Sequence, residues 1–292
     1  MLLTLWDEIG LPHSKHKQVF GRQLDIIGLH VDPYAMTITM PADSKADLIS
    51  TIQAFTDTAS SRRQPLLEWQ QLLGWINWAL NAYPLLRPVL QSSYVKISGK
   101  SQAHTAIFIN CEVIRDLQWL AQVMEGMDGI CMLDAITWNH SDVDIIYCDA
   151  TLQSMGFYYM SQNTGYFSEL PNNTPLNTIF YYEALCVVSV LLWATELLFV
   201  PHRVLIYMDL LNTVEIFHSL KAPKGYNDLL LFATCCIMNA KTSLQVFHID
   251  GINNVIADTL SHSLFELVLT CHPGLNIHMF QPPQNVTGTV AL

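Results

Sequence analysis

The stretch IIYCDATLQSMGFYY (Ile145–Tyr159) begins as a run of apolar and aromatic residues and meets a carboxylate at Asp149. β-Branched and aromatic residues that lead into a short polar segment are typical of a strand followed by a hairpin. A carboxylate at the end of a buried strand is unfavourable when it is unpaired, because charge is costly to remove from water. We therefore expect a cationic group, a hydrogen-bonding cap or a metal ion beside Asp149.

The residues after this strand alternate between strand and helix patterns. Strands are expected at 143–149, 155–161, 166–170, 203–209 and 244–249, and helices at about 179–198, 212–220, 226–240 and 253–265. Such an order predicts an α/β fold, in which a mixed sheet starts with an antiparallel hairpin and flanking helices cover its faces.

The upstream residues predict a smaller α+β region. Here we expect an antiparallel unit over 17–40 and helices over about 41–56, 66–82 and 112–126. The predicted domains are therefore residues 1–135, residues 136–270 and a C-terminal tail, 271–292.

Composition narrows the class of protein. Apolar residues make up 51% of the 292 positions, which is enough for packed cores. The seven cysteines are odd in number and form no C-x-x-C pair, so neither a zinc site nor a disulfide framework is indicated. The apolar run 184–194 is too short for a membrane span, and the N-terminus lacks a basic leader. We expect a cytoplasmic or nuclear protein with no membrane partner.

The charge is unevenly distributed. Residues 1–100 carry nine Lys/Arg against eight Asp/Glu, whereas residues 101–292 carry five against seventeen. The formal charges are therefore +1 and −12. The acidic part either avoids polyanions or holds cations that reverse its local sign.

Four acids of the second domain lie where the predicted secondary structure changes; they are Asp149, Glu183, Asp209 and Asp258. Parallel neighbouring strands would bring the first and third acids to one edge of the sheet, and the two helix acids could complete a cluster. Clustered carboxylates raise one another's pKa, and two divalent ions about 4 Å apart would relieve this and support phosphodiester cleavage. Oxygen ligands favour Mg²⁺ or Mn²⁺ over zinc. Taken singly, each acid also fits a cap, a first-turn acid or an exposed helix residue.

The motifs around these acids occur in a recognisable order. They are Asp149-Ala-Thr-x-x-x-x-Gly156, Glu183-Ala-Leu, Asp209-x-x-Asn-Thr-Val214 and His248-Ile-Asp-Gly-Ile-Asn-Asn-Val-Ile-Ala-Asp258-Thr-Leu-Ser. Over residues 143–264 the sequence resembles the ribonuclease H domain of reverse transcriptases, particularly those of DIRS-type retrotransposons. The resemblance implies a ribonuclease H-like fold, a metal site formed by the four acids and an RNA–DNA hybrid as substrate.

Three upstream motifs resemble the end of a polymerase palm, its thumb and the connection to ribonuclease H. They are Leu11-Pro-His-Ser-Lys15, Phe20-Gly-Arg-x-Leu-Asp-Ile-Ile-Gly-Leu-His-Val-Asp32, and Leu73-Gly-Trp-Ile-Asn77 with Pro84-Leu-Leu-Arg87. The polymerase motif Tyr-x-Asp-Asp does not occur in the sequence. The resemblance thus implies a missing polymerase half as a partner, and we expect no polymerase activity from this chain.

The sequence departs from the family pattern at two places. The family often has Asn or Ser after the third acid and Arg after the last Leu-Ser, whereas this chain has Leu210 and His262. A catalytically inactive relic or interaction module is therefore the main alternative to a nuclease. An integrase-like or transposase-like nuclease is a further alternative, although it would not explain the upstream motifs.

Overall fold

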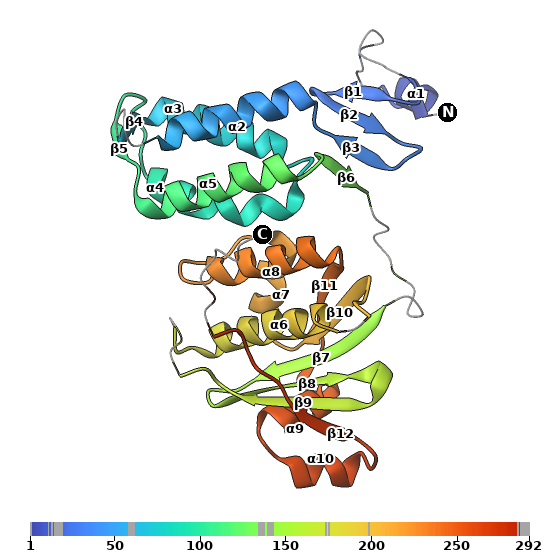
Figure 1. Cartoon of the computed structure of the whole chain (residues 1–292). Helices are drawn as coiled ribbons and strands as arrows, with labels where there is room; N and C mark the ends of the chain where they lie inside the picture. Colours follow the sequence, from blue (N-terminus) through green and yellow to red (C-terminus); the bar gives the residue numbers. More distant parts are fainter. Residues whose placement is uncertain are drawn as a thin grey trace.

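The computed structural model describes residues 2–10, 12, 14, 20–57, 62–133, 138, 143–172, 174, 176–197, 199–284 and 286. An N-terminal helical region packs against a C-terminal region built on a larger sheet (Figure 1). The expected boundary between residues 135 and 136 falls on residues outside the described ranges, so the domain limits stay a prediction. The Leu11–Lys15 motif also lies mostly outside them.

The N-terminal region contains a four-stranded antiparallel sheet, β1-β2-β3-β6, and a separate pair, β4-β5. The expected antiparallel unit is present, and β6 joins it from far along the chain. Its elements are α1 (Leu2–Glu8), β1 (Leu24–Ile26), β2 (Leu29–Asp32), β3 (Thr37–Thr39), α2 (Ala42–Thr56), β4 (Arg63–Pro65), α3 (Leu66–Ala79), η2 (Pro84–Leu90), α4 (Gln91–Ile97), β5 (Ala106–Phe108), α5 (Cys111–Gly126) and β6 (Ile130–Met132).

The C-terminal region is organised around a six-stranded mixed sheet in the order β11-β10-β7-β8-β9-β12. β10 is parallel to both β7 and β11, whereas β8 is antiparallel to its neighbours β7 and β9. The elements are β7 (Asp144–Ala150), β8 (Ser154–Tyr159), η4 (Met160–Gln162), β9 (Thr164–Glu169), α6 (Ile179–Thr195), β10 (Arg203–Met208), α7 (Leu211–Ser219), α8 (Asn227–Ala240), β11 (Ser243–His248), η5 (Gly251–Asn253), α9 (Val255–Ser261), α10 (Phe265–Cys271) and β12 (Asn276–Met279). This is the mixed sheet with flanking helices that the ribonuclease H resemblance implies, so the expected fold class is confirmed.

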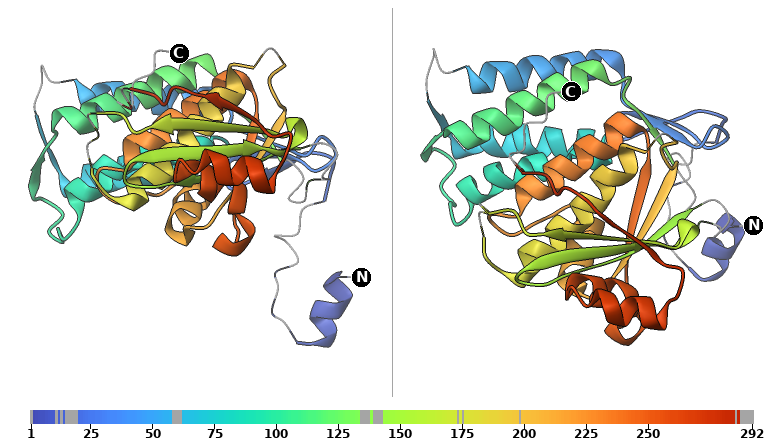
Figure 2. Two further views of the ribbon diagram at one scale, coloured as in Figure 1. Left: turned by 90° about the horizontal axis from the view of Figure 1, so that it is seen from below. Right: turned by 60° about the horizontal axis from the view of Figure 1, so that its bottom comes forward.

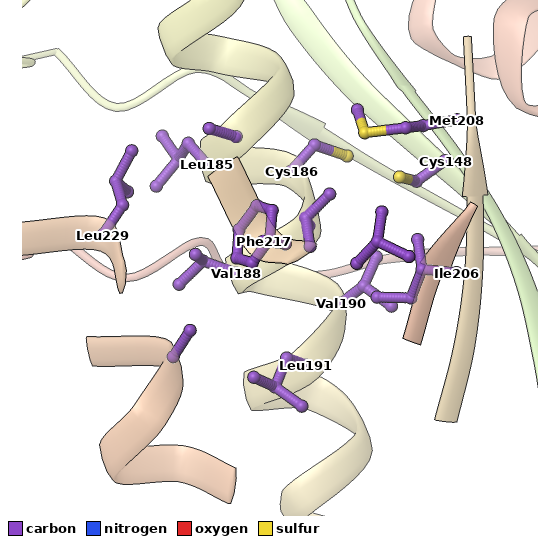
Figure 3. Close-up of a cluster of buried hydrophobic side chains, with 14 of the residues drawn as sticks. Cys148, Leu185, Cys186, Val188, Val190, Leu191, Ile206, Met208, Phe217 and Leu229 are labelled. Carbon is purple, nitrogen blue, oxygen red and sulfur yellow. The ribbon is translucent and has the colours of Figure 1, made fainter. Parts of the chain in front are cut away.

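Helices cover the two faces of this sheet in different ways. Alternate residues of β7, such as Ile146 and Cys148, point into the main core with the buried α6, while α9 packs on the other face at β7 and β8. Figure 3 shows Leu185 of α6 on the side of Leu229 in α8, and Val190 of α6 on the side of Ile206 in β10. The apolar run in α6 is therefore a buried helix, and none of the described helices combines the length and apolar character needed to cross a membrane.

Helix α8 joins the two regions. Its residues Leu229 and Leu230 belong to the core of the large sheet, whereas Leu231 and Cys235 belong to the core of the N-terminal helices. Arg115 on α5 adds ion pairs at this junction, at 2.8 Å to the buried Asp116 and 3.3 Å to Asp228 on α8. The two regions are therefore packed together through one shared helix (Figures 1 and 2).

Two features after residue 250 differ from the expected pattern. The helix expected over 253–265 is present as the shorter α9, which ends at Ser261, just before the left-handed backbone of Ser263 with φ 60°. A further helix, α10, begins at Phe265, where the expected helix was to end. The expected tail contains β12, which adds a parallel edge strand next to β9, and Phe280 beyond it enters the main core.

Candidate metal centre

The parallel neighbours β7 and β10 end at the same edge of the sheet. Asp149 is the second-last residue of β7, and Asp209 directly follows β10. Tyr147 of β7 pairs with Tyr207 of β10, so Asp149 and Asp209 occupy equivalent places two residues further on. Glu183 reaches this edge from α6. Ligand atoms of these three acids all lie within 4.8 Å of one another. The structure thus brings together three of the four acids predicted from the sequence.

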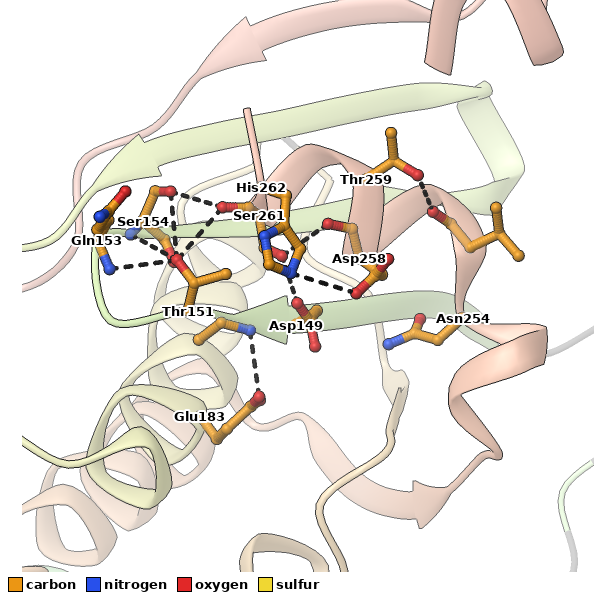
Figure 4. Close-up of polar contacts among 12 residues, drawn as sticks. Asp149, Thr151, Gln153, Ser154, Glu183, Asn254, Asp258, Thr259, Ser261 and His262 are labelled. Carbon is orange, nitrogen blue, oxygen red and sulfur yellow. Dashed lines mark hydrogen bonds and ion pairs between the residues drawn. The ribbon is translucent and has the colours of Figure 1, made fainter. Parts of the chain in front are cut away.

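Asp149 is buried and receives a hydrogen bond from the hydroxyl group of Ser261 at the end of α9 (Figure 4). This approach depends on Gly156, which lies opposite Asp149 in the antiparallel pair of β7 and β8. A Cβ at position 156 would lie 2.6 Å from the Ser261 nitrogen and 2.7 Å from the Leu260 Cβ. Glycine therefore permits α9 to contact the strand that carries Asp149.

Glu183 is also buried, but only one of its oxygens has a hydrogen-bond partner. Its Oε1 accepts a hydrogen bond of 3.3 Å from the backbone N–H of Ala150 (Figure 4). Its Oε2 is buried and has no hydrogen-bond partner among the described residues. Because buried polar atoms are rarely left unsatisfied, this oxygen points to a ligand that the protein alone does not provide.

The two buried acids have raised pKa values. Burial raises the pKa of Asp149 to about 6; the Ser261 hydrogen bond and the charge of His262 oppose this, while Asp209 and Asp258 add to it. Burial and then the nearby Asp149, Cys186 and Asp209 raise the pKa of Glu183 to about 10. Without a cation, Asp149 and Glu183 therefore keep their protons to a higher pH than free carboxyl groups do.

Asp258 lies on α9 and outside the close group of three acids. Its side chain is exposed, and its Oδ1 lies 3.7 Å from the Nε2 of His262. Its charge contributes to the raised pKa of Asp149, so it lies near enough to influence the centre. Its direct participation in metal binding stays a prediction.

Contacts at both ends hold α9 over this edge. The Nδ2 of the buried Asn254 donates to the carbonyl oxygen of Cys148 at 2.9 Å, just before α9 begins. At the other end, the Ser154 hydroxyl group donates to the carbonyl oxygen of Ser261 at 2.5 Å. Neither Asn254 nor Ser261 was predicted from the sequence to have a role, although both lie within the last motif.

The donor set fits a divalent cation. All three close ligands are carboxylates, the oxygen donors that Mg²⁺ and Mn²⁺ prefer. A cation would satisfy the unpartnered Oε2 of Glu183 and would offset the burial and the neighbouring negative charges that raise the two pKa values. These residues therefore fit the divalent metal that the sequence predicts.

No family model and no curated protein matches this sequence. Among solved structures, the chain is similar to the foamy viral protease-reverse transcriptase dRH in complex with dsDNA, with 14% identity and a TM-score of 0.30 over 79% of this chain and 38% of that one. A second foamy viral protease-reverse transcriptase, also in complex with dsDNA, gives 13% identity and a TM-score of 0.30 over 91% of this chain and 46% of that one.

The RNase H1 of the halophilic archaeon Halobacterium salinarum NRC-1 is similar to part of the chain. It gives 12% identity and a TM-score of 0.36, covering 42% of this chain and 98% of that one. The chain thus spans less than half the length of the two foamy viral proteins but nearly all of the archaeal one. At these TM-scores, none of the three structures assigns a function to this chain.

Proposed function

We propose that this chain is a ribonuclease H-type endonuclease of retrotransposon origin, which hydrolyses the RNA strand of RNA–DNA hybrids with two Mg²⁺ or Mn²⁺ ions. The observation that carries the proposal is the buried Oε2 of Glu183, which has no described hydrogen-bond partner and lies in a group of three carboxylates. A buried oxygen of this kind is unfavourable in a purely structural cluster and favourable in a metal centre.

Each acid has a distinct place in this scheme. Asp149, Glu183 and Asp209 hold the cations, while Asp258 completes the ligand set from the solvent side. When bound, the ions supply an activated water and stabilise the leaving oxygen of the phosphodiester. Ser261 orients Asp149, and the backbone N–H of Ala150 orients Glu183. The sheet edge and α9 thereby hold the carboxylates in place before substrate binds.

The proposed substrate rests on the family resemblance, and the charge of the chain sets a condition on it. A hybrid duplex is recognised through minor-groove shape, 2′-hydroxyl groups and phosphates rather than through base edges. Residues 101–292 carry a formal charge of −12, so bound cations are needed to make the centre attractive to a polyanion. A polymerase half of a retroelement protein is the proposed protein partner.

The test is cleavage of an end-labelled RNA–DNA hybrid by the purified chain, with Mg²⁺, Mn²⁺ or a chelator. Single-stranded RNA and double-stranded DNA serve as comparison substrates. Cleavage should require a divalent ion, favour the hybrid and be lost in Asp149→Asn, whose side chain keeps its size but has no charge. Equal cleavage by the wild type and this variant would refute the proposed centre.

A catalytically inactive relic is the second candidate. It is favoured by Leu210 after the third acid, by His262 after the last Leu-Ser and by the five Lys/Arg found after residue 100. In that case the well-folded wild type would cleave no substrate with any metal, although it could still bind the ions.

A further inference from the structure

A second site lies at the junction of the two regions, away from the acids. A cavity of about 510 Å³ is lined by α4, β5 and the start of α5 on one side and by the loop before α8 on the other. Lys96 and Lys100 face it from the N-terminal region, and Lys224 faces it from the C-terminal region. We call it the lysine pocket.

The charge of the lysine pocket is opposite to that of the chain. It gathers three of the 14 Lys/Arg residues of a protein with a formal charge of −11. Glu112 is the carboxylate among its lining residues, and its charge also acts on Arg115. Among the described residues, no carboxylate forms an ion pair with any of the three lysines. The pocket therefore keeps an excess of positive charge for a ligand.

The neighbouring groups also suit an anion. The ammonium group of Lys96 lies 5.8 Å from the centre of the half-exposed Phe108 ring, which limits where it can point. The 14-residue helix α8 begins beside Lys224 without a side-chain cap, so its first N–H groups add partial positive charge at the wall of the pocket. Asp228 in the same turn is negative, but it is paired with Arg115 at 3.3 Å. Phosphate is the anion that such a combination of lysines and helix start commonly binds.

The lysine pocket and the acid centre share one structural support. Tyr226, two residues after Lys224, stacks on Phe180 with ring centres 4.3 Å apart. Its hydroxyl group forms a hydrogen bond of 2.9 Å with the Thr178 hydroxyl group at the start of α6. The same helix carries Glu183 one turn further on. Figures 1 and 2 show α4, β5 and the starts of α6 and α8 on one side of the molecule.

We propose that the lysine pocket binds a backbone phosphate of the nucleic acid whose strand is cleaved at the acid centre. This inference rests on the proposed function, because it makes the pocket a contact for the same substrate. A nucleic-acid strand is favoured over a small phosphorylated molecule because the walls come from both regions and are held to the helix that carries Glu183. Such a contact is sequence-independent and electrostatic.

The test measures binding of a fluorescein-labelled RNA–DNA hybrid to the full chain by anisotropy, in chelator and over a series of salt concentrations. Lys96→Gln and Lys224→Gln remove one charge each from the pocket. Lys241→Gln removes the same charge at the opposite end of α8, where Lys241 is exposed. Thermal unfolding checks that all three variants fold like the wild type.

Log K, the logarithm of the association constant, should fall with log salt concentration less steeply in each pocket variant than in the wild type. The difference in slope should be about 0.9, the value for one lost phosphate contact. Lys241→Gln should keep the wild-type slope. Wild-type slopes in both pocket variants would overturn the proposal. The loss should be the same for hybrids of different sequence, because a backbone contact does not read bases.

A second experiment measures whether inorganic phosphate raises the thermal unfolding temperature of the wild type and of Lys224→Gln. If phosphate stabilises the wild type but not Lys224→Gln, and the hybrid slopes are unchanged, the pocket is a small-molecule site and the backbone assignment is wrong. Because binding is measured in chelator, its outcome is independent of cleavage. A chain that shows the predicted slopes but never cleaves would keep the lysine pocket and reject the nuclease.

Discussion

The two sides of the acid centre differ in their exposure to solvent. On the closed side, Asp149 and Glu183 are 5% and 3% exposed and are fixed by hydrogen bonds from Ser261 and Ala150. On the open side, Asp209 and Asp258 are exposed. Water can stabilise the charge of the open acids but not that of the closed ones. The need for a cation is therefore concentrated on the closed side, whereas the open side is where a substrate can enter.

The largest predicted effect is a difference in catalysis between variants of the closed side and variants of the open side. Asp149→Asn should reduce cleavage of the hybrid by more than about 100-fold. This exceeds the loss of activity that is usual when a residue hydrogen-bonded to a metal ligand is mutated. Asp258→Asn should reduce it less, because its carboxylate is exposed and lies outside the close group of three. The two rates are compared at equal metal concentration, and equal losses would remove the distinction between the sides.

The next effect concerns the contact between α9 and the closed side. Gly156→Ala should destabilise the fold by about 3 kcal/mol, the upper range for overpacking, because its Cβ would meet backbone atoms of residues 260 and 261 at 2.9 and 2.6 Å. Urea unfolding measures the change. Gly74→Ala is the matched control, since nothing lies within 4 Å of a Cβ there and the position is inside α3. It should stabilise by about 0.5–1 kcal/mol.

The pH dependence of stability should also distinguish the closed side. The folded-state pKa of Glu183 is raised to about 10 from an ordinary value of 4.5. The stabilisation that protonated Glu183 gives the folded state is therefore fully present below the pKa of the unfolded state. It is lost as pH rises toward the pKa of the folded state. Glutamine at this position cannot ionise, so Glu183→Gln should remove this loss.

In chelator, Glu183→Gln should unfold at a higher temperature than the wild type, with a larger difference at pH 8 than at pH 5. A difference of at least about 1 kcal/mol, or about 2–4 °C, is expected at pH 8. Added Mg²⁺ should stabilise the wild type more than the variant. The interpretation fails if the variant is less stable than the wild type at pH 8 in chelator.

The smallest effect should come from the open side. Asp258→Asn should change the free energy of unfolding by no more than about 0.5 kcal/mol, as is usual for exposed positions. Its ion pair with His262, at 3.7 Å with both side chains more than half exposed, is too solvated to contribute much. A large loss of stability in calorimetry would show that Asp258 has a structural role on α9.

Much of the fold and part of the centre could be predicted because their signals are local. The apolar run before Asp149 and the pattern before Asp209 each predict a strand, and two adjacent parallel strands place both acids at one edge. The early end of α9 and the start of α10 were not predicted, because no glycine or proline marks the left-handed backbone of Ser263. β12 was missed because a four-residue edge strand has too short a pattern.

Other features could not be predicted because they depend on distant residues meeting in space. Lys96 and Lys224 lie more than a hundred positions apart in the sequence and face one cavity only after the two regions pack. The burial of the acids also depends on residues that are distant in the sequence. Nothing in the residues next to Glu183 indicates that one of its oxygens is satisfied and the other is not.

The two-sided burial of α8 has a consequence for how the molecule unfolds. Because Leu230 contributes to one core and Leu231 to the other, opening either region exposes apolar surface on the same helix. The regions should therefore behave as one cooperative unit in hydrogen exchange, with the amides of α8 among the slowest to exchange. A fragment that starts at residue 136 would leave Leu231 and Cys235 uncovered and would tend to aggregate through that face.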